Sequence, residues 1–233
     1  MSRRSELILR AVLLLIIISL AAAVVCLALV PPVSKDALVH HLAVPRLYLE
    51  EGRIFEIPSM PYSYYPMNLE LLYLASLYLG SDIAPKLIHF LFALMTGLVI
   101  YLYLVSRRGR SVGMLGAVLF LSLPVVVKLS ISAYVDLGLA FFTTASLVMI
   151  FEWIRRGFET KFLILAALLC GLGMGTKYNG IIAALLLSLF VPFLYSRNAG
   201  AGEGSFRRAF ACGLLFVFVS GLVFMPWMVR NHV

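Results

Sequence analysis

The sequence predicts an all-α integral membrane protein with about seven transmembrane helices and a long first loop on the outer side. Of its 233 residues, 62% are hydrophobic and 13% are charged, and the mean hydropathy is +1.01. Soluble domains are about 45–50% apolar and about 25% charged. The apolar runs are continuous, whereas the strands of a transmembrane barrel alternate in hydrophobicity over about ten residues. The spans are therefore expected to be helices.

Seven apolar stretches approach the length of about 20 residues that a helix needs to cross about 30 Å of hydrocarbon. We predict spans over residues 11–30, 83–106, 111–127, 131–151, 162–176, 180–195 and 209–229. The chain is thus expected to be one transmembrane module, 1–233. Its parts are a first span (1–30), an outer loop (31–82) and about six further spans (83–233).

The basic residues predict the orientation of the module. With a cytoplasmic N-terminus, 12 of the 19 Lys and Arg residues lie on the inner side and seven on the outer side, as the positive-inside rule requires. The formal net charge of +8 is then an orientation signal that also attracts anionic lipid headgroups, and nucleic acid is not an expected partner. The inner loops are short, so chemistry is expected on the outer face.

The segment directly after the first span carries the first candidate residue. "VSKDALVHHLAVPRLYLEEGRI", residues 33–54, alternates leucines with polar residues and reads as an amphipathic segment on the membrane surface, interrupted near Pro45 and stopped at Gly52. Such a segment would hold Asp36 partly desolvated, where a carboxylate can act as a base. A lone aspartate at this place is otherwise a solvated cap.

A second short apolar segment, Met67–Leu79, contains Glu70 and is predicted to be another interfacial helix. It has about 13 residues, which is short for a span. The alternative, a marginal span, would invert everything that follows and reverse the count of basic residues.

Asp136 lies a few residues into the apolar stretch 131–151. An ionisable group inside a span is costly and is a functional candidate by default. The alternative is a carboxylate at the outer water interface that pairs with Lys128.

The turn "GLGMGTKYNG", residues 171–180, carries the third set of candidates: Lys177, Tyr178 and Asn179. The preceding span, 162–176, rises only about 22 Å, so these residues are expected in a depression below the outer headgroups. A lysine there suits a lipid phosphate, although plain snorkelling to the surface explains it equally well. Arg230 follows the last span and adds a second cation to this face.

These motifs in this order resemble polytopic glycosyltransferases of the GT-C class. The resemblance rests on "VHHLAVPRLYLEEGRI", "YSYYPMNLELLYLASLYLGSDIAPKLIHF", "AYVDLGLAFFTTA", "GLGMGTKYNG" and "PWMVRN". It runs over nearly the whole chain. It is strongest for the lipid-linked-sugar branch, which includes aminoarabinose transferases, protein O-mannosyltransferases and the RgtA/B/C/D-like domain.

The resemblance implies an inverting transfer of a sugar from a polyprenyl-phosphate donor to a lipid, glycan or protein acceptor. The reaction would take place on the outer, periplasmic face of the plasma (inner) membrane. By matching position, Asp36 would be the base or an acceptor-orienting carboxylate. Asp136 would position the acceptor or help hold a divalent metal.

The donor side follows from the same resemblance. Lys177 would bind the donor phosphate, beside Tyr178 and Asn179, and Arg230 would share that task. His40 or His41 would line the same cleft, with an interfacial histidine satisfied by solvent as the alternative; His41 is the candidate for substrate binding.

Two departures from the family pattern leave questions open. Many relatives carry an acidic pair where this chain has only Asp36, flanked by Lys35, which leaves metal binding there undecided. Relatives also continue through more spans, so we expect Val233 to end an N-terminal module. A transporter or flippase for a lipid-linked or small anionic substrate, and a non-catalytic scaffold subunit, are the alternative functions.

Overall fold

A computed structural model describes residues 3–199 and 205–231, and every regular element in these ranges is a helix. The all-α prediction is therefore confirmed. The chain divides into two compact units, one made of Met1–Ser63 and Leu69–Phe141, the other of Tyr64–Asn68 and Phe142–Val233. The segment around Glu203, between the predicted spans 180–195 and 209–229, and the chain end at Val233 lie outside the described residues.

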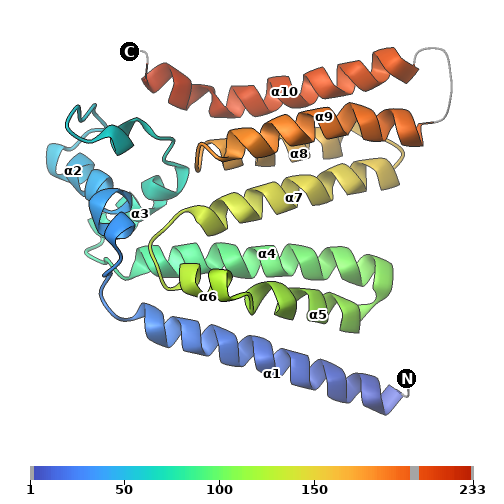
Figure 1. The fold of residues 1–233 in the computed structure, drawn as a ribbon, viewed down its shortest axis with the longest axis horizontal. Coiled ribbons are helices and arrows are strands. Elements are labelled where there is room, and N and C mark those ends of the chain that lie inside the picture. Colours follow the sequence, from blue (N-terminus) through green and yellow to red (C-terminus); the bar gives the residue numbers. More distant parts are fainter. Residues whose placement is uncertain (1–2, 200–204, 232–233) are drawn as a thin grey trace. The chain divides into compact units, whose positions relative to one another are not determined.

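Four helices form the body of the first unit (Figure 1): α1 (Arg3–Ala28), α4 (Ala84–Arg108), α5 (Arg110–Leu121) and α6 (Pro124–Ser130). α4 packs against α5 and α6, and α1 packs against all three. Many large apolar side chains on these helices stay exposed, as expected of surfaces that face lipid rather than water.

The predicted outer loop contains four short helices: η1, a π-helix (Ala37–His41), α2 (Ala43–Glu51), η2, a 3₁₀-helix (Pro61–Tyr64), and α3 (Asn68–Tyr78). The predicted break near Pro45 falls at Leu42 instead. Pro45 lies in the first turn of α2, where the missing N–H of proline costs no helical hydrogen bond. Helices thus occupy both segments that the sequence predicts to be interfacial, and their position at a membrane surface stays a prediction.

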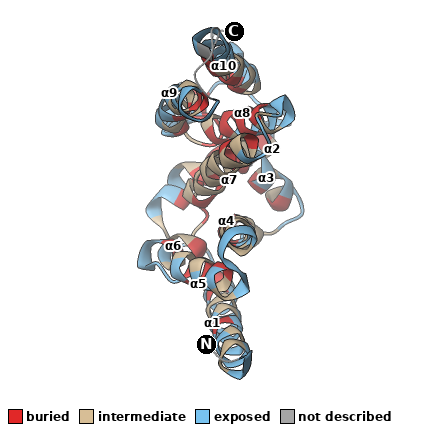
Figure 2. Ribbon diagram, turned by 90° about the vertical axis from the view of Figure 1, so that its right-hand side faces the viewer, coloured by how far each residue is buried: buried red, intermediate tan, exposed pale blue. Residues whose placement is uncertain are grey.

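The second unit contains the larger part of α7 (Asp136–Arg155), followed by α8 (Thr160–Met174), α9 (Gly180–Asn198) and α10 (Ser205–Arg230). α8, α9 and α10 contact one another. Their core is apolar and contains side chains such as Trp153, which is buried beneath Phe158 and Tyr195. Figure 2 shows the buried residues of α8.

The expected count of seven spans is not confirmed. Five helices of the described chain are long and apolar enough to cross a membrane, namely α1, α4, α7, α9 and α10. The predicted span 111–127 is broken into α5 and α6, which bend by 67° and would make a sixth span if they count as one. The bend precedes Pro124, because a proline disfavours helical geometry in the residue before it. α8 is the short apolar helix expected from 162–176.

One buried lysine fixes the point where the chain leaves α1. Lys86, in the first turn of α4, is 2% exposed, and its ammonium donates a hydrogen bond to the carbonyl of Val30. That carbonyl lies just beyond the end of α1, where the last C=O groups of a helix have no helical partner. The start of α4 is thereby tied to the segment that leads to Asp36.

Candidate functional site

Asp36 immediately precedes the π-helix η1, and its side chain makes no capping hydrogen bond. It is exposed and has no hydrogen-bond or ion-pair partner among the described residues. The partial desolvation predicted for this carboxylate is therefore not provided by the protein chain. Because π-turns occur frequently at functional sites, the helical geometry next to Asp36 is itself notable: Leu42 N–H donates to the Ala37 carbonyl at 2.9 Å.

His41, at the other end of η1, is buried and paired with a buried carboxylate. Its Nδ1 lies 2.8 Å from Oε1 of Glu70, and both side chains are less than a tenth exposed. An ionised carboxylate only accepts, so the histidine donates from Nδ1 and a neutral ring presents Nε2 as an acceptor. The second carboxylate oxygen, Oε2 of Glu70, is buried without a hydrogen-bond partner among the described residues.

Aromatic rings surround this pair. The ring of His40 lies 3.9 Å from that of His41 and stacks on Tyr62 at 4.4 Å. The ring of Tyr134 lies 5.6 Å from His41. These ring contacts pack the imidazole of His41 against neighbours from two segments of the chain.

Tyr73 connects α3 to the segment before α7. It lies three residues after Glu70, hence on the same face of α3, and its hydroxyl donates to the carbonyl of Tyr134. Burial, followed by the nearby carboxylates of Glu70 and Asp136, holds the pKa of Tyr73 well above its usual range. The hydroxyl therefore stays a donor throughout the physiological pH range.

Asp136 is the first residue of α7, a helix long and apolar enough to span a membrane, whereas the sequence analysis placed it a few residues into a span. Residues 131–135 are not part of the helix. A carboxylate is stabilised at a helix N-terminus by the dipole and the unsatisfied N–H groups. Asp136 is half-buried, and the helix start offers its carboxylate a stabilising position within an apolar stretch of sequence.

A histidine from α4 fixes this helix start. His89 is fully buried; its Nε2 accepts the N–H of Leu137 at 2.9 Å, and its Nδ1 donates to the carbonyls of Ser132 (2.9 Å) and Leu129 (3.0 Å). These partners define a neutral ring with the proton on Nδ1. His89 therefore caps α7 and holds the backbone that positions Asp136.

In the second unit, Asn68 ties two helix ends together. Its N–H donates to the Gly175 carbonyl at 2.9 Å and its amide to the Leu172 carbonyl at 3.2 Å, while its Oδ1 accepts the Trp227 indole N–H at 2.9 Å. A Cβ on Gly175 would lie 2.3 Å from Nδ2 of Asn68. The glycine that the sequence places before Lys177 is thus required by the close approach of Asn68.

The neighbouring segment joins Tyr178 to the end of α10. Tyr178 Oη donates to the Tyr64 carbonyl at 3.1 Å, and Asn231 Nδ2 donates to the same carbonyl at 2.8 Å. Arg230 donates to Oδ1 of Asn231 at 3.0 Å and lies near the Tyr65 carbonyl. We call residues 64–68 with these partners the 64–68 clasp.

The 64–68 clasp brings together two of the four candidates for donor binding. Tyr178 and Arg230 share Asn231 as a partner, and the guanidinium of Arg230 lies 5.0 Å over the ring of Trp227. Lys177 is half-buried in the turn beside Tyr178. Asn179 is the exposed N-cap of α9 and makes no side-chain capping bond.

The candidates of the first unit do not all meet. His41 and the segment before Asp136 are linked through Tyr134, whereas Asp36 is bonded to neither. Glu70, Tyr73 and His89 complete the first unit's polar network. The sequence analysis noted Glu70 only as an acid in a short apolar helix, and it did not identify Tyr73 or His89. In the sequence, the only indication of a role for these residues is that each is a polar side chain within an apolar stretch. No group of three or more His, Cys, Asp or Glu side chains that could hold a metal occurs in the described part of the chain.

The chain is similar to known proteins over most of its length. A model of the family described as dolichyl-phosphate-mannose-protein mannosyltransferase matches residues 38–233. The curated undecaprenyl phosphate-alpha-4-amino-4-deoxy-L-arabinose arabinosyl transferase 2 of Proteus mirabilis is 28% identical over 136 residues. That match covers 58% of this chain and 24% of the relative, so the chain spans about a quarter of the relative's length. No solved structure matches.

Proposed function

Because the chain belongs to the dolichyl-phosphate-mannose-protein mannosyltransferase family, we propose that it transfers a sugar from a polyprenyl-phosphate donor to an acceptor hydroxyl. The site would face the outer side of the membrane. The observation that carries the proposal is the extent of the family match: it includes His41, Asp136, Lys177 and Arg230, and begins two residues after Asp36. The chain is a multi-pass membrane protein of a glycosyltransferase family that uses lipid-linked donors.

Asp36 is proposed as the base. In the transfer, the acceptor oxygen forms a bond to the anomeric carbon while the bond from that carbon to the phosphate oxygen breaks. The acceptor proton passes to the carboxylate, and polyprenyl phosphate leaves with the electron pair of the broken bond. The exposed, unpaired carboxylate of Asp36 suits this role, because a base must be reachable by the acceptor hydroxyl.

Asp136 and His41 are proposed to orient the acceptor. Asp136 is held by the start of α7, which His89 caps, and His41 is held by Glu70. Groups whose own orientation is fixed by neighbours lower the entropy lost on reaching a reactive geometry.

Lys177 and Arg230 are proposed to bind the donor phosphate, with Tyr178 and Asn179 beside them. The phosphate gains negative charge as the sugar leaves, and a fixed cation stabilises that charge. The 64–68 clasp supports the proposal, because it links the turn that carries Lys177 to the end of α10, where Arg230 lies.

The donor site can be tested without knowledge of the sugar by measuring the affinity of undecaprenyl phosphate for the purified protein. We expect Lys177→Ala to weaken binding about tenfold, because it removes a charge-assisted contact. Arg197→Ala removes an exposed arginine from the last turn of α9 and is the matched control. Equal affinities in the two variants would contradict the assignment of Lys177.

A further inference from the structure

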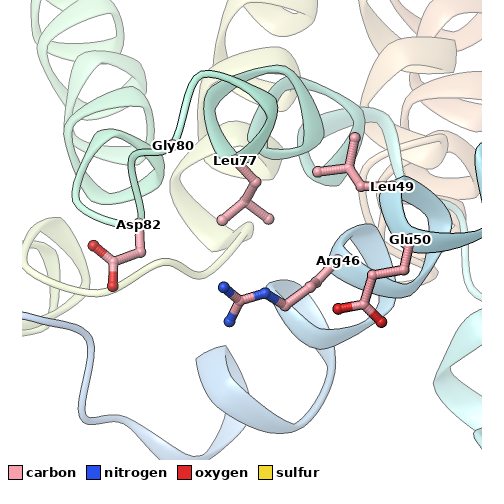
Figure 3. A pocket seen from close by; sticks show the side chains of 6 residues that line it. All are labelled: Arg46, Leu49, Glu50, Leu77, Gly80 and Asp82. Atoms are coloured by element: carbon pink, nitrogen blue, oxygen red, sulfur yellow. The ribbon is translucent and has the colours of Figure 1, made fainter.

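A cavity of about 380 Å³ lies in the first unit, outside the residues described above. α2 contributes Arg46, Leu49 and Glu50 to its wall, and α3 with the turn after it contributes Leu77, Gly80 and Asp82. Figure 3 shows these side chains, with the guanidinium of Arg46 between the carboxylates of Glu50 and Asp82 in this view. The wall of the cavity therefore carries one cationic and two anionic side chains.

The three charged groups are not satisfied by one another. Arg46, Glu50 and Asp82 form no hydrogen bond or ion pair with any residue that the structure describes. Glu50 and Arg46 are four residues apart on α2, a spacing at which opposite charges commonly pair. All three side chains are exposed, and Asp82 also interacts electrostatically with Lys86 in the first turn of α4. A ligand that offers both an anionic and a cationic group could therefore reach all three charges.

The chain around the cavity has two features that are expected near a membrane surface. Asp82 is two residues before α4, one of the helices long and apolar enough to span the membrane. Tyr78 and Leu79 lie at the end of α3 next to the cavity and are 78% and 81% exposed. Large apolar side chains exposed beside the start of a span are expected to contact lipid.

A glycine forms the turn in this wall of the cavity. Gly80 has φ +79°, a left-handed conformation that glycine adopts without strain. Its N–H donates to the Leu77 carbonyl at 2.9 Å, which ends α3 and turns the chain toward Asp82. A Cβ at Gly80 would meet no atom within 4 Å, so the space beside it is open.

We propose that this cavity binds the phosphoethanolamine headgroup of a membrane lipid. Arg46 would bind the phosphate, since guanidinium donors match phosphate oxygens. Glu50 and Asp82 would accept hydrogen bonds from the ammonium group. A choline headgroup offers no N–H donor and is recognised by aromatic rings, and none of the six lining residues is aromatic. A glycerol headgroup brings a phosphate but no cation to the two carboxylates.

The inference stands apart from the proposed glycosyl transfer. Its residues are not among the candidates for catalysis or donor binding, and its readout is lipid composition rather than product. A protein that transferred no sugar would still be expected to bind the lipid, and a protein that bound no lipid here could still transfer sugar. The two claims can therefore fail separately.

The test is to place the full chain in nanodiscs made from an equimolar mixture of phosphatidylethanolamine, phosphatidylcholine and phosphatidylglycerol. The lipids that stay bound after transfer to detergent are then measured by mass spectrometry. We expect the molar ratio of retained phosphatidylethanolamine to each of the other two lipids to be about fivefold higher than in the mixture, the effect of about one favourable surface charge. Arg46→Gln should abolish the enrichment, and Glu50→Gln with Asp82→Asn should remove the preference over phosphatidylcholine.

Arg53→Gln and Glu51→Gln, which change exposed charges near α2 but outside the cavity, should keep the wild-type enrichment. Equal enrichment in Arg46→Gln and Arg53→Gln, or no enrichment in the wild-type protein, would overturn the proposal. Binding of soluble phosphoethanolamine by the lipid-free protein, lost in Arg46→Gln, would assign the cavity to a free ligand and would overturn the lipid assignment.

Discussion

At the scale of single residues, the main finding is that His41 and Glu70 form a buried pair instead of two separate solvent-exposed side chains. The two residues are 29 positions apart in the sequence. From the sequence alone, a histidine that lines the cleft and an interfacial histidine satisfied by solvent are equally good interpretations. Neither helical periodicity nor local charge patterning reports a contact at that separation. Burial and pairing of the two side chains could therefore be found only in the structure.

We predict that His41 and Glu70 are energetically coupled. In a double-mutant cycle with His41→Phe and Glu70→Leu, unfolding in detergent should give a coupling of about 0.5–3 kcal/mol, because either single change leaves a buried polar group without its partner. The same cycle with His41→Phe and Glu51→Gln, which do not touch, is the control. A coupling near zero for the first cycle would show that the pair does not stabilise the fold.

Tyr73 yields a prediction about pH. Its pKa is raised in the folded protein by burial, then by the carboxylates of Glu70 and Asp136. Below the ordinary tyrosine pKa of about 10, the hydroxyl is neutral in both the folded and the unfolded chain. The contribution of Tyr73 to stability is present there and falls as the pH rises from about 10 toward the raised folded value.

Tyr73→Phe should therefore lose less stability than the wild-type protein between neutral pH and pH 11. The comparison of the two pH profiles of thermal unfolding isolates this residue, because all other groups titrate in both proteins. Parallel profiles would mean that Tyr73 ionises as readily in the folded protein as in the unfolded chain.

At the scale of elements, the apolar pattern predicts most helices closely, because long continuous apolar runs have few alternative structures in a membrane protein. The predicted span 180–195 is found as α9 (Gly180–Asn198), and 83–106 as α4 (Ala84–Arg108). The apolar pattern predicted a helix end wrongly where a contact with another helix determines that end. α7 begins at Asp136, five residues later than predicted, where His89 of α4 caps it.

The 64–68 clasp makes a sharp prediction at this scale. Gly175→Ala should destabilise the protein by about 1–3 kcal/mol, because the added methyl overlaps the Asn68 amide. In an Asn68→Ala background the same change should cost little more, since the obstructing amide is gone. Thermal unfolding of the single and double variants measures both effects.

Gly221→Ala is the matched control, because a Cβ at Gly221 meets no atom within 4 Å. It should leave the unfolding temperature unchanged or raise it slightly. If Gly175→Ala behaved like Gly221→Ala, the close contact between Gly175 and Asn68 would not exist in the protein.

At the scale of the whole molecule, the sequence predicts the membrane class, the helical fold and the family, because composition and the order of motifs carry that information. The partners of the 64–68 clasp lie more than 100 residues away along the chain and have no local signature. The number of spans depends on the bend before Pro124 and on whether the short helix α8 crosses the membrane. The length of the apolar stretches alone determines neither of these.

The predicted orientation can be tested by cysteine labelling in a background without Cys26, Cys170 and Cys212. Ser59→Cys, in the predicted outer loop, should react with an impermeant reagent added to intact cells. Arg108→Cys, at the end of α4 that is predicted to face the cytoplasm, should react only after the membrane is opened. The reverse pattern would invert the topology and move the proposed site to the inner face.

The central claim, that the chain is a glycosyltransferase whose base is Asp36, is tested most directly by transfer itself. Reconstituted wild-type protein is given polyprenyl-phosphate hexoses and pentoses labelled in the sugar, with a cell-envelope extract as acceptor. Release of polyprenyl phosphate and labelling of the acceptor are followed together. We predict that Asp36→Asn slows both by about 10²–10⁴-fold, whereas Glu51→Gln, an exposed acid at the end of α2, keeps the wild-type rate. Transfer at the wild-type rate in Asp36→Asn would contradict the account.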